Sequence, residues 1–159
     1  MELPAKTEYA MRAIVDLAAQ RGGQTTFDEI AQRQKVPPNF MPQIMRELAR
    51  AGLVTAVRGF GGGVRLALDP GAISVRAVME AVQGPLALYR CLSQAECEHE
   101  ADCVLRDLWV QAQDEMLKVF ERTTVADLMQ RVRRTKCSKG GALAACGAGG
   151  CPQEDTDAR

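Results

Sequence analysis

The chain has 159 residues, of which 47% are hydrophobic and 25% are charged, and these values are ordinary for one globular domain with extensions. Twenty basic and twenty acidic residues give a formal net charge of zero, which excludes a bulk polycation. Charged residues interrupt the first twenty positions, and no run reaches the roughly 18 apolar residues that a membrane helix needs, so we expect a cytoplasmic protein without a membrane partner.

Two helices are predicted first in chain order. Apolar residues at helical spacing predict a helix over residues 5–20, which a pair of glycines ends. Thr26 and Glu29 have the spacing of a capping box, in which each residue bonds the backbone of the other, and they open a short helix that runs to about residue 33.

The third predicted helix follows a Pro-Pro turn. Asn39 is a good N-cap residue, and we expect the helix to run from there to Arg50 and to stop at Gly52. Pro42 then occupies the third helical position, where its missing N–H would have had no partner in any case. Ile44, Met45 and Leu48 would face the protein interior.

A β-hairpin is predicted next. Residues 53–57 and 64–68 are strand-like, and the glycine-rich segment 58–63 joins them. A helix, a helix-turn-helix pair and a hairpin in this order predict a winged helix, so the fold class is mainly α with one small β-hairpin.

The second half of the chain is predicted to be helical around one polar loop. Its expected parts are a helix over 75–83 that Ser74 opens, a cysteine-bearing loop over 88–103, a long helix over 104–122, a last helix over 125–134 that Thr124 caps, and a flexible tail from Lys136.

The charges of the chain are distributed unevenly, although they cancel overall. Residues 30–66 hold six basic residues against one acid, Glu47, and such a local patch is what phosphate neutralisation requires. A solvated helix face is the alternative explanation. The start of the second helix of a helix-turn-helix pair enters the major groove, and a glycine-rich wing permits close approach to the DNA backbone. Gln43 could read adenine by a two-point contact. The candidate DNA-binding residues are Asn39, Phe40, Gln43, Arg46, Arg50, Arg58, Gly59 and Gly61.

Six cysteines fall into two sets of three, and only the first set has regular spacing. Cys91, Cys97 and Cys103 are separated by five residues each, whereas Cys137, Cys146 and Cys151 lie in a Gly/Ala-rich tail and are predicted to be mobile thiols. In a reducing compartment such a density points to metal or redox chemistry. Zinc sites usually draw ligands from closer pairs, so the wide spacing favours an iron–sulfur cluster, and free thiols are the alternative.

Three cysteines leave an iron–sulfur cluster one ligand short. His99, the single histidine, lies between two of them, and Glu8 could be supplied by another subunit. Four acids in the same loop would raise the thiol pKa values in the absence of metal, which favours a metal-loaded site over a purely thiol-reactive one.

Three stretches together resemble a bacterial family of winged-helix regulators, the IscR/NsrR type. They are Lys6-Thr7-Glu8-Tyr9-Ala10, the segment from Gly52-Leu53-Val54 to Arg58-Gly59-Phe60-Gly61-Gly62-Gly63, and the cysteine triplet followed by Leu108-Trp109. The similarity covers residues 1 to about 134. It implies a homodimer joined through the long helix, an iron–sulfur cluster in the loop of each subunit, and binding to double-stranded operator DNA that depends on the state of the cluster.

Departures from the family pattern bear on the type of cluster. IscR-type proteins have a histidine three residues after the third cysteine as a ligand to a 2Fe–2S cluster, and Arg106 stands there in this chain. NsrR-type proteins donate a carboxylate from the first helix across the dimer to a 4Fe–4S cluster, and Glu8 occupies that place. The resemblance therefore favours 4Fe–4S over 2Fe–2S. Pro42 replaces a glutamate that IscR uses in base choice.

These observations predict a regulator of transcription, a repressor that senses iron, nitric oxide or redox state, and not an enzyme. The predicted domains are a winged-helix DNA-binding domain (1–84), a cluster loop (85–103), a dimerisation helix with the final helix (104–134) and a flexible tail (135–159). The alternatives are a metal-free or zinc-bound regulator that works by thiol chemistry, and an iron–sulfur assembly or carrier protein.

Overall fold

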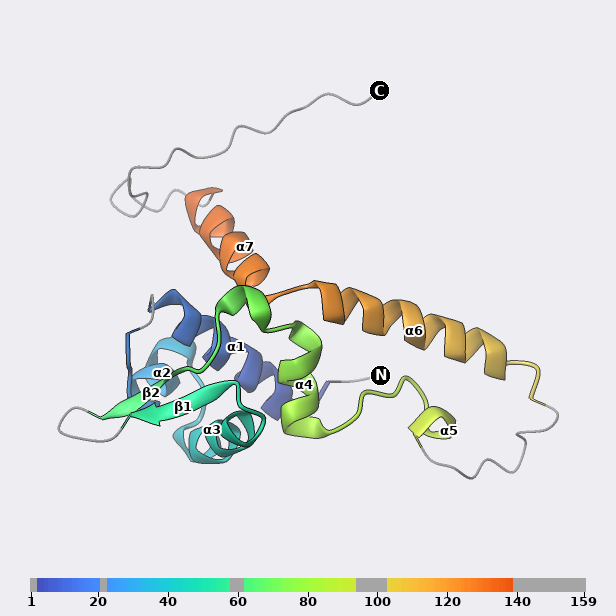
Figure 1. The fold of residues 1–159 in the computed structure, drawn as a ribbon, viewed down its shortest axis with the longest axis horizontal. Helices are drawn as coiled ribbons and strands as arrows, with labels where there is room; N and C mark the ends of the chain where they lie inside the picture. Colours follow the sequence, from blue (N-terminus) through green and yellow to red (C-terminus); the bar gives the residue numbers. More distant parts are fainter. Residues whose placement is uncertain (1–2, 21–22, 58–61, 94–102, 139–159) are drawn as a thin grey trace, which may run out of the picture.

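The computed structural model describes residues 3–20, 23–57, 62–93 and 103–138. Figure 1 shows a compact body from which two long helices extend. The elements in chain order are α1 (Ala5–Ala19), α2 (Phe27–Gln34), the 3-10 turn η1 (Pro38–Phe40), α3 (Met41–Arg50), β1 (Val54–Val57), β2 (Gly63–Leu66), the 3-10 turn η2 (Pro70–Ala72), α4 (Val75–Gln83), α5 (Arg90–Ser93), α6 (Arg106–Arg122) and α7 (Val125–Ser138). The predicted fold class, mainly helical with one small hairpin, is confirmed.

Helix α1 is the centre of the body. Its residues Ala10, Ala13 and Ile14 are fully buried, and the helix packs against α2, α3, α4, α7 and β2. The apolar stripe predicted from the sequence is the side of α1 that faces this core. Because α2 and α3 both rest on α1, the helix-turn-helix pair has a rigid support.

The hairpin pairs β1 with β2 in antiparallel register, from Val54 opposite Leu66 to Val57 opposite Gly63. Thr25, just before α2, forms a further bridge with Val64: the two residues exchange backbone hydrogen bonds of 3.1 and 2.8 Å. A Cβ atom at Gly63 would lie 2.5 Å from the carbonyl oxygen of Thr25, so this close approach requires glycine. The hairpin is therefore attached to the start of α2.

Three predicted caps are present. Thr26 and Glu29 form the expected capping box at α2, and Ser74 caps α4 by accepting a hydrogen bond from the backbone N–H of Ala77. Thr124 and Asp127 form a similar reciprocal pair at α7, with hydrogen bonds of 2.9 and 3.2 Å.

The predicted start of the third helix was wrong. Asn39 lies inside the 3-10 turn η1, and the N-cap of α3 is Phe40, whose side chain caps nothing. Pro42 is consequently the second residue of α3 and not the third. The two prolines before Asn39 cause the difference, because proline suits the first positions of a helix and starts the 3-10 turn early.

Helix α6 runs back toward the body, and α7 begins at the body and extends away from it (Figure 1). The first turns of α6 lie far from the winged-helix body. Val125 at the start of α7 is fully buried, and its N–H donates to the carbonyl oxygen of Ile73, while the N–H of Val75 donates to the carbonyl oxygen of Thr123. The beginning of α7 is thus part of the same core as α1 and α4.

Two further details differ from the prediction. The expected cysteine loop contains the short helix α5, and α7 continues to Ser138, so that Cys137 lies on a helix where a flexible tail was predicted. Cys146 and Cys151 lie outside the described residues. Within the described part of the chain, no helix combines the length and the apolar run that a membrane crossing requires.

Candidate functional site

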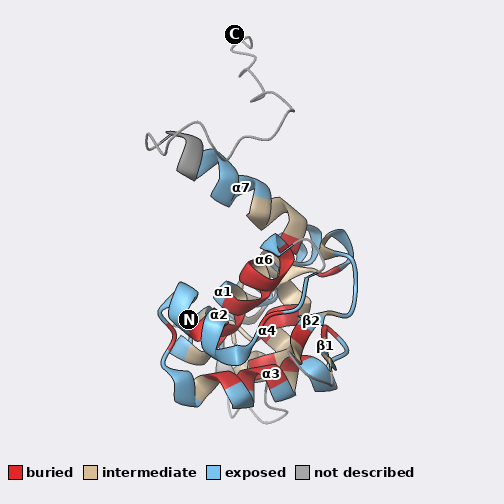
Figure 2. Ribbon diagram, turned by 90° about the vertical axis from the view of Figure 1, so that its left-hand side faces the viewer, coloured by how far each residue is buried: buried red, intermediate tan, exposed pale blue. Residues whose placement is uncertain are grey.

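Helix α3 presents one buried and one exposed face. Ile44, Met45 and Leu48 are at most 3% exposed, as predicted, and hold the helix against the body. Gln43, Arg46 and Arg50 are exposed on the outer side of the helix. Figure 2 shows this division: the side of α3 toward the body is buried and the outer side is open to solvent. An exposed helix with an amide and two guanidinium groups has the chemistry that reads base edges and binds phosphates.

The residues before α3 have different surroundings. Asn39 is exposed, whereas Phe40 is half-buried with its ring edge-on to Tyr9, the ring centroids 5.4 Å apart. The ring of Phe40 therefore packs against α1 and determines where α3 begins. The wing residues Arg58, Gly59 and Gly61 lie outside the described residues.

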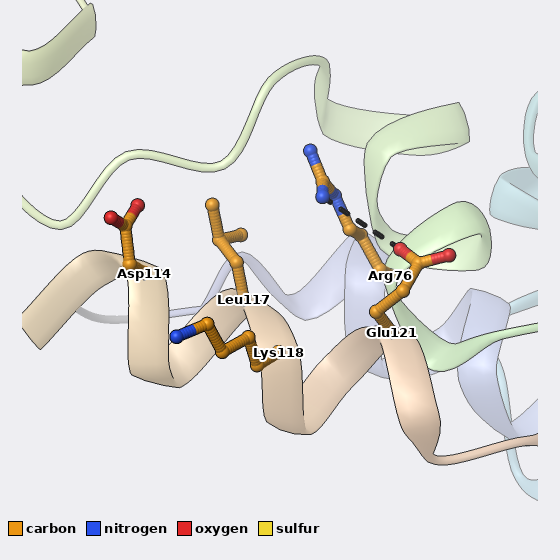
Figure 3. A pocket seen from close by; sticks show the side chains of 5 residues that line it. All are labelled: Arg76, Asp114, Leu117, Lys118 and Glu121. Atoms are coloured by element: carbon orange, nitrogen blue, oxygen red, sulfur yellow. Dashed lines mark ion pairs between the residues drawn. The ribbon is translucent and has the colours of Figure 1, made fainter.

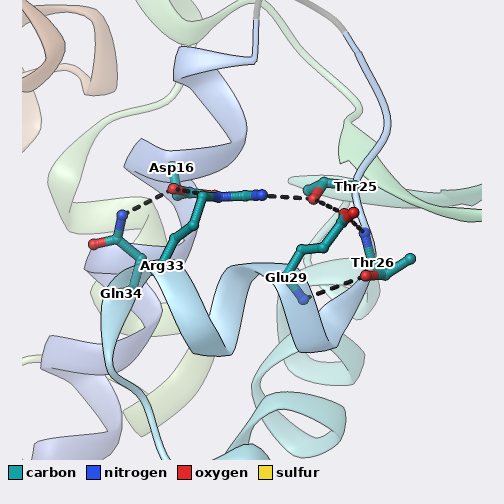
Figure 4. A network of polar contacts seen from close by, with 6 residues as sticks. All are labelled: Asp16, Thr25, Thr26, Glu29, Arg33 and Gln34. Atoms are coloured by element: carbon teal, nitrogen blue, oxygen red, sulfur yellow. Dashed lines mark hydrogen bonds and ion pairs between the residues drawn. The ribbon is translucent and has the colours of Figure 1, made fainter.

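One basic residue of the local patch, Arg33, has a structural role. Its guanidinium group forms a two-point contact with the carboxylate of Asp16, which is 6% exposed, with a closest distance of 2.7 Å. It also donates to the hydroxyl oxygen of Thr25 at 2.8 Å, and the side chain of Gln34 donates to Asp16. Figure 4 shows this network, which joins α1 to both ends of α2. The guanidinium group of Arg33, although 37% exposed, is therefore engaged by the buried Asp16 and by Thr25.

The same network favours the charged forms of Glu29 and Arg33. A hydrogen bond from the hydroxyl of Thr25, followed by bonds from Thr26, lowers the pKa of Glu29, and the hydrogen bond to Asp16 raises the pKa of Arg33. Because the folded-state pKa of Glu29 is depressed, its contribution to stability is present above the unfolded pKa and is lost as the pH falls through the folded pKa.

Asp16→Ala should lower the free energy of unfolding by about 1–3 kcal/mol, because Arg33 and Gln34 lose their shared acceptor and a part-buried ion pair is broken. Urea unfolding monitored by circular dichroism measures the change. Lys118→Ala is the control, since it breaks an exposed ion pair with Glu115 and should cost less than about 1 kcal/mol. Equal losses in the two variants would show that the Asp16 network does not stabilise the domain.

Sequence reasoning missed the partners of Gln43. Its amide nitrogen donates to Oε1 of Glu47 at 3.2 Å, and the ammonium group of Lys6 lies 3.1 Å from each oxygen of the same carboxylate. Glu47 was visible in the sequence as the one acid of the basic segment, but nothing in the chain pattern pairs it with a lysine 41 residues earlier.

Three successive residues of α1 have three different partners. Lys6 contacts α3, the hydroxyl of the fully buried Thr7 donates to the side-chain oxygen of Gln83 at the end of α4 at 2.5 Å, and Glu8 forms an exposed ion pair with Arg12. The first turn of α1 therefore touches both the candidate reading helix and the helix that leads into the cysteine segment.

The first and third cysteines of the regularly spaced set lie at the two ends of the predicted cysteine segment. Cys91 lies on α5 and Cys103 lies just before α6, and both are half-buried free thiols. Tyr89 stacks on Trp109 of α6 with ring centroids 4.4 Å apart, and the N–H of Leu88 donates to the side chain of Gln113. The start of the cysteine segment is thereby attached to α6.

The remaining candidate ligands are distributed as follows. Cys97 and His99 lie outside the described residues, and among those that the structure does describe no three ligand-type side chains come together. Two free thiols at the ends of the segment are compatible in donor chemistry with an iron–sulfur cluster. Glu8 is exposed, and its carboxylate is paired with Arg12.

A shallow pocket of about 220 Å³ lies between α4 and α6 (Figure 3). Arg76 crosses it to Glu121 at 3.7 Å and also pairs with Glu80, while Lys118 pairs with Glu115. Both basic residues of the pocket are thus paired with acids, and the Arg76–Glu121 pair joins α4 to α6.

Helix α6 exposes apolar side chains along its length. All of its residues are described and none is buried, and Leu108, Val110 and Val119 are 54%, 39% and 42% exposed. Leu105, just before the helix, is 49% exposed. Leu108 and Val119 are about three turns apart on one side of the helix, whereas Val110 lies on another side. Large apolar side chains exposed on one side of a helix are typical of a protein–protein interface.

Comparisons with known proteins agree with this architecture. The profile of the Rrf2 family, described as an iron-dependent transcriptional regulator, matches residues 3–131. The HTH-type transcriptional regulator IscR of Vibrio cholerae is 31% identical over 130 residues, which are 81% of this chain and 75% of the relative. The solved structure of CymR, the global cysteine regulator of B. subtilis, is similar with a TM-score of 0.72 and 27% identity, over 82% of this chain and 98% of that one. IscR of T. potens is similar with a TM-score of 0.71 and 26% identity, over 86% of this chain and 91% of that one.

Proposed function

Because the chain belongs to the Rrf2 family of winged-helix transcriptional regulators, we propose that it is a homodimeric repressor whose binding to operator DNA depends on an iron–sulfur cluster. The matched proteins are regulators of transcription and not enzymes. The observation that carries the proposal is the combination, in one chain, of an exposed reading helix and a segment bracketed by two free thiols. The protein would act in the cytoplasm, where the DNA is.

In this proposal the outer face of α3 enters the major groove. Gln43 would contact a base, Arg46 and Arg50 would contact phosphates, and Asn39 would lie at the entering end. Arg58, Gly59 and Gly61 would meet the backbone or the minor groove as the wing. Phe40 would contribute by fixing the start of α3.

The exposed apolar face of α6 would form the dimer interface. A two-fold dimer buries the same surface of both subunits, which suits a single long helix with apolar residues along it. Two copies of α3 would then meet half-sites about 34 Å apart or a multiple of that distance.

Cys91, Cys97 and Cys103 would hold the cluster, and Glu8 of the other subunit would be the fourth ligand of a 4Fe–4S cluster. The cluster would supply an iron that reacts with nitric oxide or oxygen, since a carboxylate oxygen is a weaker ligand for iron–sulfur iron than a thiolate. To bind iron, Glu8 would have to give up its ion pair with Arg12. Lys6 and Thr7 in the same turn contact α3 and α4, so a movement of this turn would reach both helices.

Anaerobic purification with an absorption spectrum and a count of iron and acid-labile sulfide tests the cluster. Iron and sulfide in equal amounts with visible absorption support the proposal. Colourless protein that still binds DNA would instead support the second candidate, a metal-free or zinc-bound thiol regulator, which the free thiols of Cys91 and Cys103 and the similarity to a cysteine regulator favour.

Arg46→Ala and Arg50→Ala should each weaken binding to every DNA sequence about equally and reduce the slope of log K against log salt by about one. The physical reason is that each substitution removes one phosphate contact and the counterion release that accompanies it. Fluorescence anisotropy with a mixed-sequence duplex of about 30 base pairs, enough for two half-sites, measures the slope.

Arg131→Ala is the matched control, because α7 lies on the opposite side of the body from α3 (Figure 1). It should leave the slope unchanged. An equal reduction in all three variants would mean that general charge, and not the face of α3, determines binding.

A further inference from the structure

Gln43 of α3 is held by a neighbour on its own helix. Glu47 lies one turn further along α3, and its Oε1 accepts a hydrogen bond from the side-chain nitrogen of Gln43 at 3.2 Å. The ammonium group of Lys6, which comes from α1, lies 3.1 Å from Oε1 and from Oε2 of the same carboxylate. One carboxylate thus connects the candidate base-reading amide to the central helix of the body.

This contact defines the orientation of the Gln43 amide. A carboxylate only accepts hydrogen bonds, so the –NH₂ end of the Gln43 side chain must point toward Glu47 and its carbonyl oxygen must point away. One N–H and the carbonyl oxygen of Gln43 remain available to DNA. These are the donor and the acceptor that a two-point contact with adenine requires, the donor for N7 and the acceptor for the amino group at N6.

Glu47 depends in turn on Lys6. The side chains of Lys6 and Glu47 are only 25% and 19% exposed, so the pair is largely removed from water. In the part of the chain that the structure describes, Oε2 of Glu47 is buried and accepts no hydrogen bond, and the ammonium group of Lys6 is what compensates its charge. Without Lys6, the Glu47 carboxylate would lose the partner that compensates its part-buried charge and would no longer be fixed beside Gln43.

We infer that Lys6 and Glu47 are specificity-determining residues that act through Gln43: they hold its amide in the orientation that selects adenine and do not contact DNA themselves. The inference rests on the proposed function, because it requires α3 to be the reading helix. Lys6 and Glu47 are positioning residues in this scheme, and their effect is confined to the base pair that Gln43 contacts.

The test is a selection from a pool of random duplexes by the full-length, anaerobically purified protein, followed by sequencing of the bound DNA. The variants are Gln43→Ala, Glu47→Ala and Lys6→Met, the last of which keeps the aliphatic stem of lysine and removes its charge. Lys118→Ala is the matched control, since it removes a lysine and breaks an ion pair on α6, away from α3. Thermal unfolding of each variant establishes that it is folded.

Gln43→Ala should relax the preference for one base pair in each half-site by about 10-fold, as expected for the loss of a two-point base contact. Glu47→Ala and Lys6→Met should relax the preference at that same base pair. Combining Lys6→Met with Gln43→Ala should add nothing there, because both act on one contact. Lys6→Arg should retain the wild-type preference, and Lys118→Ala should change none.

The salt dependence separates positioning from direct contact. Lys6→Met should leave the slope of log K against log salt unchanged. A slope reduced by about one with an unchanged base preference would identify Lys6 as a phosphate contact and overturn the inference. Relaxation at a different base pair in Glu47→Ala would also overturn it.

Failure of the inference is distinguishable from failure of the proposed function. If the wild-type protein selects no sequence from the pool, sequence-specific binding itself is refuted. If the wild-type protein selects a sequence and Gln43→Ala changes no position, DNA recognition stands and the role of Lys6 and Glu47 is refuted.

Discussion

Single replacement of Cys91, Cys97 or Cys103 by alanine should leave the anaerobically purified protein colourless and almost free of iron. Thiolates hold iron–sulfur clusters, and the loss of any one of three cysteine ligands leaves too few thiolates to retain the cluster. The measurements are the visible absorption spectrum and the iron and sulfide content of each variant. This is the largest change that we expect from any substitution in the chain.

The second set of cysteines provides the control. Cys137→Ala, Cys146→Ala and Cys151→Ala should leave colour and iron content unchanged, since these residues are assigned no role in the cluster. Full retention of iron in Cys97→Ala would contradict the ligand assignment. Loss of iron in both sets of variants would indicate a site built from all six thiols.

Glu8→Ala should make the cluster more labile and uncouple DNA affinity from the state of the cluster. If Glu8 bonds iron across the dimer, its loss should accelerate cluster decay in air by at least about 10-fold, since even residues that only support metal ligands change affinity by about 10- to 100-fold. The decay of the visible absorption measures the first effect. DNA affinity before and after cluster loss measures the second, and the two values should become equal in the variant.

Two further variants make this test specific. Glu8→Asp should retain a stable cluster, because it keeps the carboxylate and is one methylene shorter. His99→Ala should change neither decay nor affinity. If His99→Ala accelerates decay and Glu8→Ala does not, His99 is the ligand and the proposed connection across the dimer is refuted.

Elements with strong local signals were predicted well from the sequence. The apolar stripe of α1, the capping box at α2 and the glycine-joined hairpin all depend on residues close together in the chain, and each is present. The start of α3 was misplaced because two prolines before Asn39 favoured a 3-10 turn over a side-chain cap. Local competition between two helix-starting signals is difficult to resolve without the surrounding packing.

Contacts between distant residues could not be predicted in the same way. Arg33 was counted among the basic residues of the DNA-binding patch, but it pairs with the buried Asp16 seventeen positions earlier. The connection of Lys6 to Glu47 spans 41 positions. Charge patterns along a chain show which residues could pair, and only the packing of α1 against α2 and α3 determines which of them do.

The first turn of α1 also constrains how this protein can change in evolution. Successive residues of an α-helix point about 100° apart, which is how Lys6, Thr7 and Glu8 reach three different partners from one turn. Inserting or deleting one residue between Ala10 and this turn would rotate all three side chains together and break every one of these connections at once. Relatives should therefore vary in length before Pro4 but keep a constant number of residues between this turn and the buried part of α1. Substitutions at position 6 should accompany substitutions at position 47, so that the two positions covary among relatives.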